Sequence, residues 1–373
     1  MEARCLVYKR QYANRSLQWH VVHDPCNPQQ APDVVFDDVT FNPLLDPLIS
    51  TELVQMLSSW GSTSSSNPTS SLTAMLELLL SLYMQHQKEK IAALQDDRLL
   101  FELAMLEDLG CSEVLLSAAA DGSQQACFSI PVEADLAPAQ RLIDCLQQQQ
   151  QQQQERQPFM LHVAFRVGRG VSSHAAPELQ LQYPHFAEQQ LPPLSLPSWD
   201  PQTSLVEYVP HLAERLNKHL QDSCPAAVLR FDLVKALAGV FGHPLEVNMQ
   251  GSSAVKGSAA AGSSSSFAGT SSSMGRAKTF SSSSSSAVFQ LQFDQQPLLL
   301  FVEMPPSFPA EAPLLLLQSM RRMGPDSCAA LSNIPWSPRW DAAEMAARLF
   351  NFVKQQAPGI LKDMEGGSSG AAL

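Results

Sequence analysis

The sequence predicts an α+β protein of more than one domain, in which antiparallel meander sheets are packed by helices. Three observations support this fold class. Short runs of alternating apolar residues predict strands, longer apolar runs near helical spacing predict helices, and one spaced proline pattern occurs twice. The chain has 373 residues, of which 45% are hydrophobic, so two or three domain cores are expected.

The first half of the chain is predicted to contain strands separated by two apolar helices. The helices are expected over 72–87 and 91–109, the second because Ile91, Leu94 and Leu99 are near helical spacing. The strands are expected over 17–23, 34–36, 126–132, 159–167 and 178–183.

The second half is predicted to begin with two helices, over 204–221 and 226–241. Pro210 should kink the first of them or mark its true start, because proline cannot donate a backbone hydrogen bond. The elements that follow are strands over 245–249, 287–293 and 297–303, and a last helix over 341–354.

Low-complexity segments interrupt these elements. Gln147–Gln154 is a glutamine run, and residues 251–286 are nearly all Ser, Gly and Ala, as is the tail 365–373. Such segments bury too little apolar surface to order themselves, so both insertions and the tail are predicted to be disordered. The serine-rich insertion lies between two strands that should pair, so it is interpreted as an enlarged hairpin loop.

The composition argues against several classes of partner. The net charge is −12 and no Lys/Arg run occurs, which argues against direct binding to nucleic acid or an anionic membrane. No apolar stretch approaches the ~20 residues of a membrane span. The seven cysteines form no C-x-x-C pair, so neither a zinc site nor a disulfide framework is expected, and no cofactor is implied. Free thiols are typical of a reducing compartment, so cytoplasm and nucleus are the expected locations.

A duplicated proline pattern is the most informative feature. Residues 25–36 and 306–317 both read P-x-x-P-x-x-A-P followed by an apolar strand. Each copy is followed by a tryptophan, Trp60 or Trp336, and then by an apolar helix. The shared order predicts duplicated units in which the prolines turn the chain at a sheet edge.

The second copy resembles the ubiquitin-conjugating enzyme (E2) superfamily. Residues 308–314 fit F-P-x-x-x-P-x-[VIL], and Trp336-Ser337-Pro338 fits the W-S-P that opens the next helix in that superfamily. This resemblance implies tandem degenerate E2/UEV-like domains, where UEV denotes a ubiquitin E2 variant.

A closer resemblance is to the BRE family, the tandem-UEV subunits of the BRISC deubiquitinase assembly and of its nuclear DNA-repair counterpart, the BRCA-A complex. Residues 336–346 resemble the family's S-P-R-W-D-x-x-E-M-A, and Glu207-Tyr208-Val209-Pro210 resembles its D-Y-V-P. Residues 98–102 resemble its connecting helix, and the segments 17–19 and 58–60 resemble its first UEV domain. The opening helix of that domain has no counterpart here, and the serine-rich insertion is foreign to the family pattern.

The resemblance implies three regions. An N-terminal UEV-like domain is expected over 1–87, a helix plus β-rich middle region over 88–203, and a C-terminal UEV-like domain over 204–364. The middle region has the element order of the first half of an E2 fold, so a third, degenerate UEV copy is one interpretation of it.

An active E2 needs a cysteine thiolate and a side-chain donor that stabilises the oxyanion. Residues 37–59 contain no cysteine, which excludes conjugation by the first domain. In the second domain Cys328 precedes Trp336 by eight residues, but no H-P-N motif precedes it. The histidines also lack the spacing of a metal-dependent isopeptidase. A non-catalytic protein with an incidental Cys328 is therefore predicted.

The BRE resemblance implies a scaffold in a complex that trims lysine-sixty-three-linked ubiquitin chains, with links to the DNA damage response and ubiquitin signalling. The implied partners are a JAMM-type isopeptidase subunit with its MPN-like partner, an adaptor subunit and, as a further candidate, ubiquitin. The alternatives are an active E2-like enzyme that uses Cys328 and a free ubiquitin-binding UEV protein. The candidate interaction residues are Trp336, Pro338, Arg339, Trp340 and Asp341, although packing and an N-terminal helix cap by Asp341 would explain the same pattern.

Overall fold

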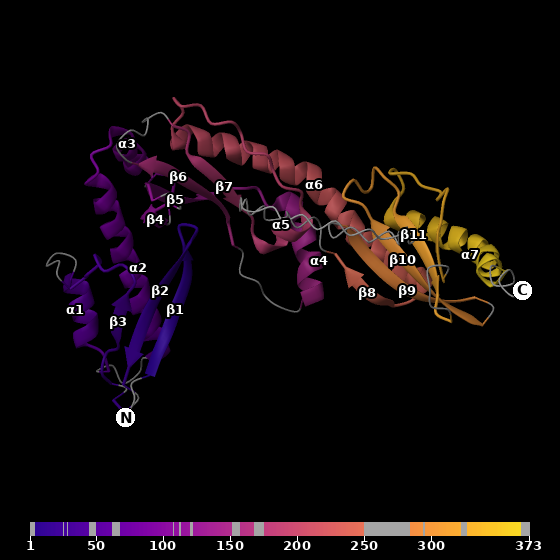
Figure 1. Ribbon diagram of the computed structural model, residues 1–373, viewed down its shortest axis with the longest axis horizontal. Helices are drawn as coiled ribbons and strands as arrows, with labels where there is room; N and C mark the ends of the chain where they lie inside the picture. The colour runs from indigo at the N-terminus through magenta and orange to yellow at the C-terminus, as the bar shows by residue number, and fades with distance from the viewer. Residues whose placement is uncertain are drawn as a thin grey trace, which may run out of the picture. The chain divides into compact units, whose positions relative to one another are not determined.

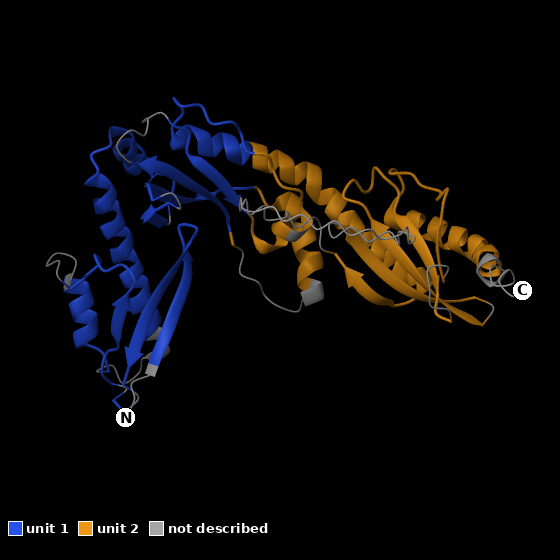
Figure 2. Ribbon diagram, viewed as in Figure 1, with its two compact units in different colours: residues 1–134, 158–182, 196–214 blue, residues 135–157, 183–195, 215–373 orange. Residues whose placement is uncertain are grey.

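The structure, a computed structural model, contains three antiparallel sheets with helices, which confirms the α+β class (Figure 1). It describes residues 4–24, 26–27, 29–44, 50–61, 68–106, 108–111, 113–119, 122–150, 157–167, 175–249, 284–293, 295–321 and 327–366. Of the segments predicted to be disordered, residues 151–154, 251–283 and 367–373 lie outside this set. The prediction is wrong for residues 147–150 and 365–366, which lie in helices, and for residues 285–286, which lie in a strand. The chain divides into unit 1, residues 1–134, 158–182 and 196–214, and unit 2, residues 135–157, 183–195 and 215–373 (Figure 2).

Unit 1 begins with a three-stranded sheet in the order β1-β2-β3. A tight hairpin joins the first two strands, with Ala13 and Asn14 at φ 46° and 60°, the left-handed conformation that such turns require. The strands are β1 (Arg4–Tyr12), β2 (Arg15–His23) and β3 (Asp33–Phe36), so the strands predicted over 17–23 and 34–36 are confirmed. Strand β1 was not predicted from the sequence, because its charged residues alternate poorly with its apolar ones.

An aromatic cluster forms the core between this sheet and α2 (Pro68–Ala92), which follows α1 (Ser50–Ser58). Trp19 of β2 is fully buried, and its ring meets that of Tyr83 edge to face with centroids 6.0 Å apart. Met75, Leu79 and Tyr83 are buried at intervals of four residues, so one face of α2 covers the sheet.

The second predicted helix starts later than expected. The expectation of a helix over 91–109 is wrong at its beginning, because α2 continues to Ala92 and a turn separates it from α3 (Asp97–Met105). Gln95 in this turn has φ 54°, and Asp96 caps α3 by accepting a hydrogen bond from the Leu99 amide at 3.1 Å. These two residues end one helix and start the next.

A second sheet in unit 1 has the order β4-β5-β6-β7. The strands are β4 (Glu113–Ala118), β5 (Gln124–Val132), β6 (Phe159–Val167) and β7 (Glu178–Gln182). The three strands predicted in this region are confirmed as β5, β6 and β7, whereas β4 was not predicted.

Helix α6 (Leu205–Phe241) is one continuous helix of 37 residues. The expectation of two helices over 204–221 and 226–241 is therefore wrong, and Pro210 is not the true start of a helix. Leu220, Cys224 and Ala227 are fully buried on one face of the helix that runs past exposed Pro225, and this packing offsets the backbone hydrogen bond that the proline cannot make. Residues 205–214 belong to unit 1 and the rest of α6 to unit 2.

Unit 2 contains a five-stranded sheet in the order β12-β11-β10-β9-β8. Its strands are β8 (Pro244–Asn248), β9 (Ser285–Phe293), β10 (Gln296–Met304), β11 (Leu314–Ser319) and β12 (Cys328–Ala330). Strands β8 and β9 pair antiparallel, which confirms that the serine-rich insertion joins two paired strands.

The helices of unit 2 include η1 (Ala137–Ala139), α4 (Gln140–Gln150), α5 (His185–Gln190) and α7 (Ala342–Gly366). Helix α7 extends beyond the predicted end at 354 and contains Pro358. Val353, Ala357 and Leu361 are buried at intervals of four, so the same apolar face continues past the proline. Among the described residues, no helix is both long and apolar enough to cross a lipid bilayer.

Candidate functional site

The segment that opens α7 contains the residues predicted as an interaction site. The Trp336 Nε1–H donates a hydrogen bond to the Pro309 carbonyl at 3.0 Å, and its ring centroid lies 5.4 Å from that of Phe308. Phe308 is itself buried, with 2% of its surface exposed. The two motifs that carried the E2 resemblance are therefore in direct contact.

The other predicted residues form the N-terminal end of α7. Asp341 Oδ1 accepts a hydrogen bond from the Glu344 amide at 2.8 Å and so caps the helix. The guanidinium of Arg348 lies 4.0 Å from the Trp340 ring centroid, close enough for a cation–π contact. Pro338 and Arg339 are exposed. These contacts are internal to the protein, and a role of this segment in binding a partner remains a prediction.

Cys328 is the exposed first residue of β12 and pairs with Gln318 of β11. Its Sγ lies 3.8 Å from the Ser327 Oγ, a neutral hydroxyl that does not act as a general base. In the part of the chain that the structure describes, no group of histidine, cysteine or carboxylate side chains could hold a metal ion.

The structure brings together two other segments that resemble the BRE family. Glu102 of α3 has 1% of its surface exposed, and its Oε2 accepts a hydrogen bond from the Leu205 amide at 3.0 Å, at the first residue of α6. Arg98, one turn earlier, donates to the carbonyls of Pro201 at 2.7 Å and Thr203 at 3.0 Å, and lies 3.5 Å from Glu102 Oε1. We name this arrangement of Arg98 and Glu102 against residues 201–205 the α3–α6 joint.

Aromatic rings surround the α3–α6 joint. The Arg98 guanidinium lies 5.6 Å from the ring centroid of Trp199 and 5.7 Å from that of Phe165. Tyr208, in the second turn of α6, donates its hydroxyl to the Pro197 carbonyl at 3.0 Å and packs on Trp199. Burial raises the pKa of Glu102, although the Leu205 amide and Arg98 oppose this rise. The buried carboxyl thus joins two helices that are far apart in sequence.

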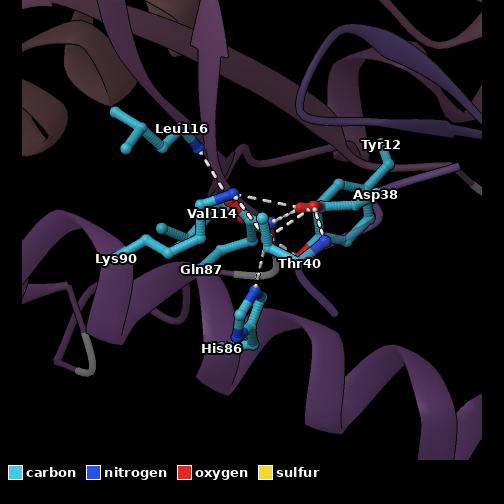
Figure 3. Close-up of polar contacts among 8 residues, drawn as sticks. All are labelled: Tyr12, Asp38, Thr40, His86, Gln87, Lys90, Val114 and Leu116. Carbon is cyan, nitrogen blue, oxygen red and sulfur yellow. Dashed lines mark hydrogen bonds and ion pairs between the residues drawn. The ribbon is translucent and has the colours of Figure 1, made fainter. Parts of the chain in front are cut away.

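A second polar cluster in unit 1 centres on Asp38, in the loop after β3 (Figure 3). Asp38 Oδ2 accepts hydrogen bonds from Gln87 Nε2 at 2.9 Å and Lys90 Nζ at 3.1 Å, both from α2. Asp38 Oδ1 accepts from the Thr40 hydroxyl at 2.6 Å, and that hydroxyl lies 3.1 Å from His86 Nε2. We name these five residues the Asp38 network.

The Asp38 network also reaches the second sheet of unit 1. Gln87 is fully buried, and its Oε1 accepts a hydrogen bond from the Leu116 amide of β4 at 3.1 Å. Beside it, Tyr12 of the first sheet donates its hydroxyl to the Val114 carbonyl of β4 at 3.2 Å (Figure 3). These bonds tie the loop after β3, helix α2 and strand β4 together.

The ionisation of the network follows from burial and hydrogen bonding. Burial alone would raise the pKa of Asp38, but the hydrogen bonds from Thr40 and Lys90, together with the Lys90 charge, lower it to about 2. Burial lowers the pKa of His86 and raises that of Tyr83. The aspartate is therefore held as an anion, which suits a structural anchor more than a proton donor.

Sequence reasoning missed both the Asp38 network and the α3–α6 joint. One signal was present in α2, because Gln87 continues the apolar positions 75, 79 and 83 at the same interval of four. A polar residue at a buried position needs a hydrogen-bond partner, so this glutamine indicated an anchor without showing its partner.

The fold and these contacts define an α+β protein whose buried polar groups join helices and sheets. Comparison with known proteins gives the family: the family model of brain and reproductive organ-expressed protein (BRE) matches residues 4–247, and the chain belongs to that family. A relative from Branchiostoma floridae, named BRISC and BRCA1-A complex member 2, is 24% identical over 364 residues, which cover 94% of this chain and 82% of the relative.

Proposed function

We propose that this protein is a non-catalytic scaffold subunit of a deubiquitinase complex of the BRISC and BRCA1-A type. The family match over residues 4–247 carries this proposal. The relative named as a member of those complexes supports it, because its similarity extends over 94% of this chain. In this role the protein holds a JAMM-type isopeptidase subunit, its MPN-like partner and an adaptor subunit together.

The site geometry supports a structural role over a catalytic one. The carboxylates of Glu102 and Asp38 accept hydrogen bonds from other elements of the fold. Glu102 accepts from the backbone amide of Leu205, and Asp38 accepts from the side chain of Gln87. Groups that join elements in this way give a scaffold a defined shape. We further propose that the complex acts on lysine-sixty-three-linked ubiquitin chains in DNA damage and ubiquitin signalling, in cytoplasm and nucleus, through tandem UEV-like domains.

Affinity purification of the tagged full chain from its own cells tests this proposal. Mass spectrometry should identify a JAMM-type isopeptidase, and the eluate should cleave lysine-sixty-three-linked chains with an activity that zinc chelation removes. A protein recovered without an isopeptidase would contradict the proposal.

The same preparation separates the scaffold from an E2-like enzyme. Incubation with ubiquitin, an activating enzyme and ATP should give no thioester on this chain. A thioester that Cys328→Ser removes, and that Cys26→Ser at another exposed thiol leaves intact, would instead establish conjugation through Cys328.

A further inference from the structure

Helix α3 exposes large apolar side chains on the face opposite its anchor. Leu100 and Phe101 are 38% and 52% exposed, whereas Leu99 and Leu106 on the other face are 3% and 0% exposed. Ala104 is also exposed and lies one turn after these two residues. We name Leu100, Phe101 and Ala104 the α3 stripe. The outer face of a helix normally carries polar residues, so an apolar stripe there needs a reason.

The helix beneath the stripe is firmly held. Asp96 caps its first turn, and Glu102 and Arg98 attach it to residues 201–205 through the α3–α6 joint. A stripe on a pre-ordered helix loses little conformational entropy when a partner binds, which favours association. Val39, in contrast, is 93% exposed but lies in the loop after β3, as scattered surface apolar residues commonly do.

The charges around the stripe are negative. Asp97 in the first turn of α3 and Asp108 just beyond its last turn are both exposed. The single basic residue of α3 is Arg98, whose side chain is 16% exposed and whose guanidinium donates to Pro201 and Thr203 carbonyls. The ends of the stripe therefore present carboxylates without a neighbouring cation on the same helix, which favours a positively charged partner.

From these observations we propose that the α3 stripe is a docking surface for a basic amphipathic helix of a partner subunit. The apolar side of that helix packs on Leu100 and Phe101, and its flanking Lys or Arg residues pair with Asp97 and Asp108. Helices that lay an apolar face on a complementary surface are a common recognition mode, and large side chains such as Phe101 are typical anchors. The inference rests on the proposed function, because the partner is sought among the subunits of the complex.

Photo-crosslinking in the reconstituted complex identifies the occupant. A photoreactive phenylalanine analogue replaces Phe101 in the full chain, and the matched control replaces Val39 in the same way. We expect a cross-link from position 101 to a segment of another subunit that alternates apolar with Lys or Arg residues at helical spacing. A cross-link to an acidic segment or to a second copy of this chain, or none above the Val39 control, would overturn the proposal.

Variants of the stripe measure its contribution. Phe101→Glu should weaken retention of the cross-linked subunit at least about tenfold, with Phe101→Ala intermediate and Val39→Glu unchanged. The double variant Asp97→Lys and Asp108→Lys should weaken it several-fold at low salt, with the difference shrinking at high salt. Hydrogen exchange of α3 checks that each variant remains folded. Retention equal to wild type for Phe101→Glu, with α3 still protected, would refute the docking surface.

The two proposals fail in different ways. If the wild-type chain assembles with the isopeptidase and adaptor while every stripe variant assembles equally well, the complex stands and the α3 surface does not. If the wild-type chain does not assemble with these subunits, the proposed function itself is wrong.

Discussion

The α3–α6 joint and the Asp38 network of unit 1 differ from the segment that opens α7 in unit 2 in the kind of contact that holds them. In unit 1, charged and amide side chains make the connections, as in the Asp38 network and the α3–α6 joint. In unit 2, the segment that leads into α7 is held mainly by rings, with Trp336 against Phe308 and one indole hydrogen bond to Pro309.

This difference determines how much stability a substitution at each of these sites should cost. A buried carboxylate with several partners leaves those partners unsatisfied when it is removed, so its loss is costly. A ring contact that is partly exposed loses mainly contact area, so its loss costs less. Substitutions at the α3–α6 joint should therefore have larger effects than comparable ones in the segment that opens α7.

Replacing Glu102 should have the largest effect. Glu102→Ala leaves the Leu205 amide without its acceptor and Arg98 without its carboxylate, and we expect about 3 kcal/mol less protection of α3 and of the first turns of α6. Hydrogen exchange monitored by mass spectrometry measures this locally, which avoids assuming that the chain unfolds in one step.

Glu102→Gln is the matched control for this prediction. It keeps an acceptor for the Leu205 amide and removes only the charge, so it should lose clearly less protection than the alanine variant. Equal losses for the two variants would show that the hydrogen bond from the Leu205 amide contributes little and that charge pairing with Arg98 dominates.

Trp336→Ala should destabilise the start of α7 by about 2 kcal/mol. The value lies below that of a fully buried tryptophan because the Trp336 ring is half-buried. Trp336→Phe keeps a ring beside Phe308 but loses the hydrogen bond to Pro309, so it should cost about half as much. Exchange of the α7 amides distinguishes the two variants, and a loss above that of Glu102→Ala would reverse the ranking of the two sites.

Acid should weaken the Asp38 network. Because the pKa of Asp38 is lowered from 3.8 to about 2, its contribution is present above about pH 5 and is lost as pH falls through about 2. We expect about 1.5 kcal/mol, less than the full shift implies because water partly screens the carboxylate. Exchange of α2 amides near pH 6 and pH 3, after correction for intrinsic rates, should show about half of this loss in wild type, because at pH 3 the carboxylate of the folded state is still largely ionised. Asp38→Asn should show less pH dependence, and an identical profile would contradict the assignment.

Local patterns in the sequence predicted elements well where one face of the element is buried. In strand β6 buried residues alternate with half-buried or exposed ones, and its bounds agree with the prediction. The proline pattern likewise anticipated a turn before β11. Both features depend on neighbouring residues, which a single sequence displays directly.

Other features depend on residues that are distant in sequence. Gln87 meets Asp38 across 49 positions, and Glu102 meets Leu205 across 103, so no local pattern shows either pair. Burial of one helix face also outweighed the break that was expected between residues 221 and 226 of α6. Of the candidate site, the cap and packing of the α7 segment were visible in the sequence, whereas the joints of unit 1 were not.

The smallest effect is expected at the N-terminal cap of α7. Unit 1 has the same kind of cap at α3, where Asp96 accepts a hydrogen bond from the Leu99 amide. Asp341→Ala removes the acceptor for the Glu344 amide and should cost about 0.5–1 kcal/mol, whereas Asp341→Asn keeps an acceptor and should cost less. Because Asp341 is exposed, water replaces the lost bond more readily than at buried Glu102. Exchange of the first turn of α7 measures both variants. If the loss for Asp341→Ala equalled that for Glu102→Ala, burial of the carboxylate would not explain the difference between the two sites.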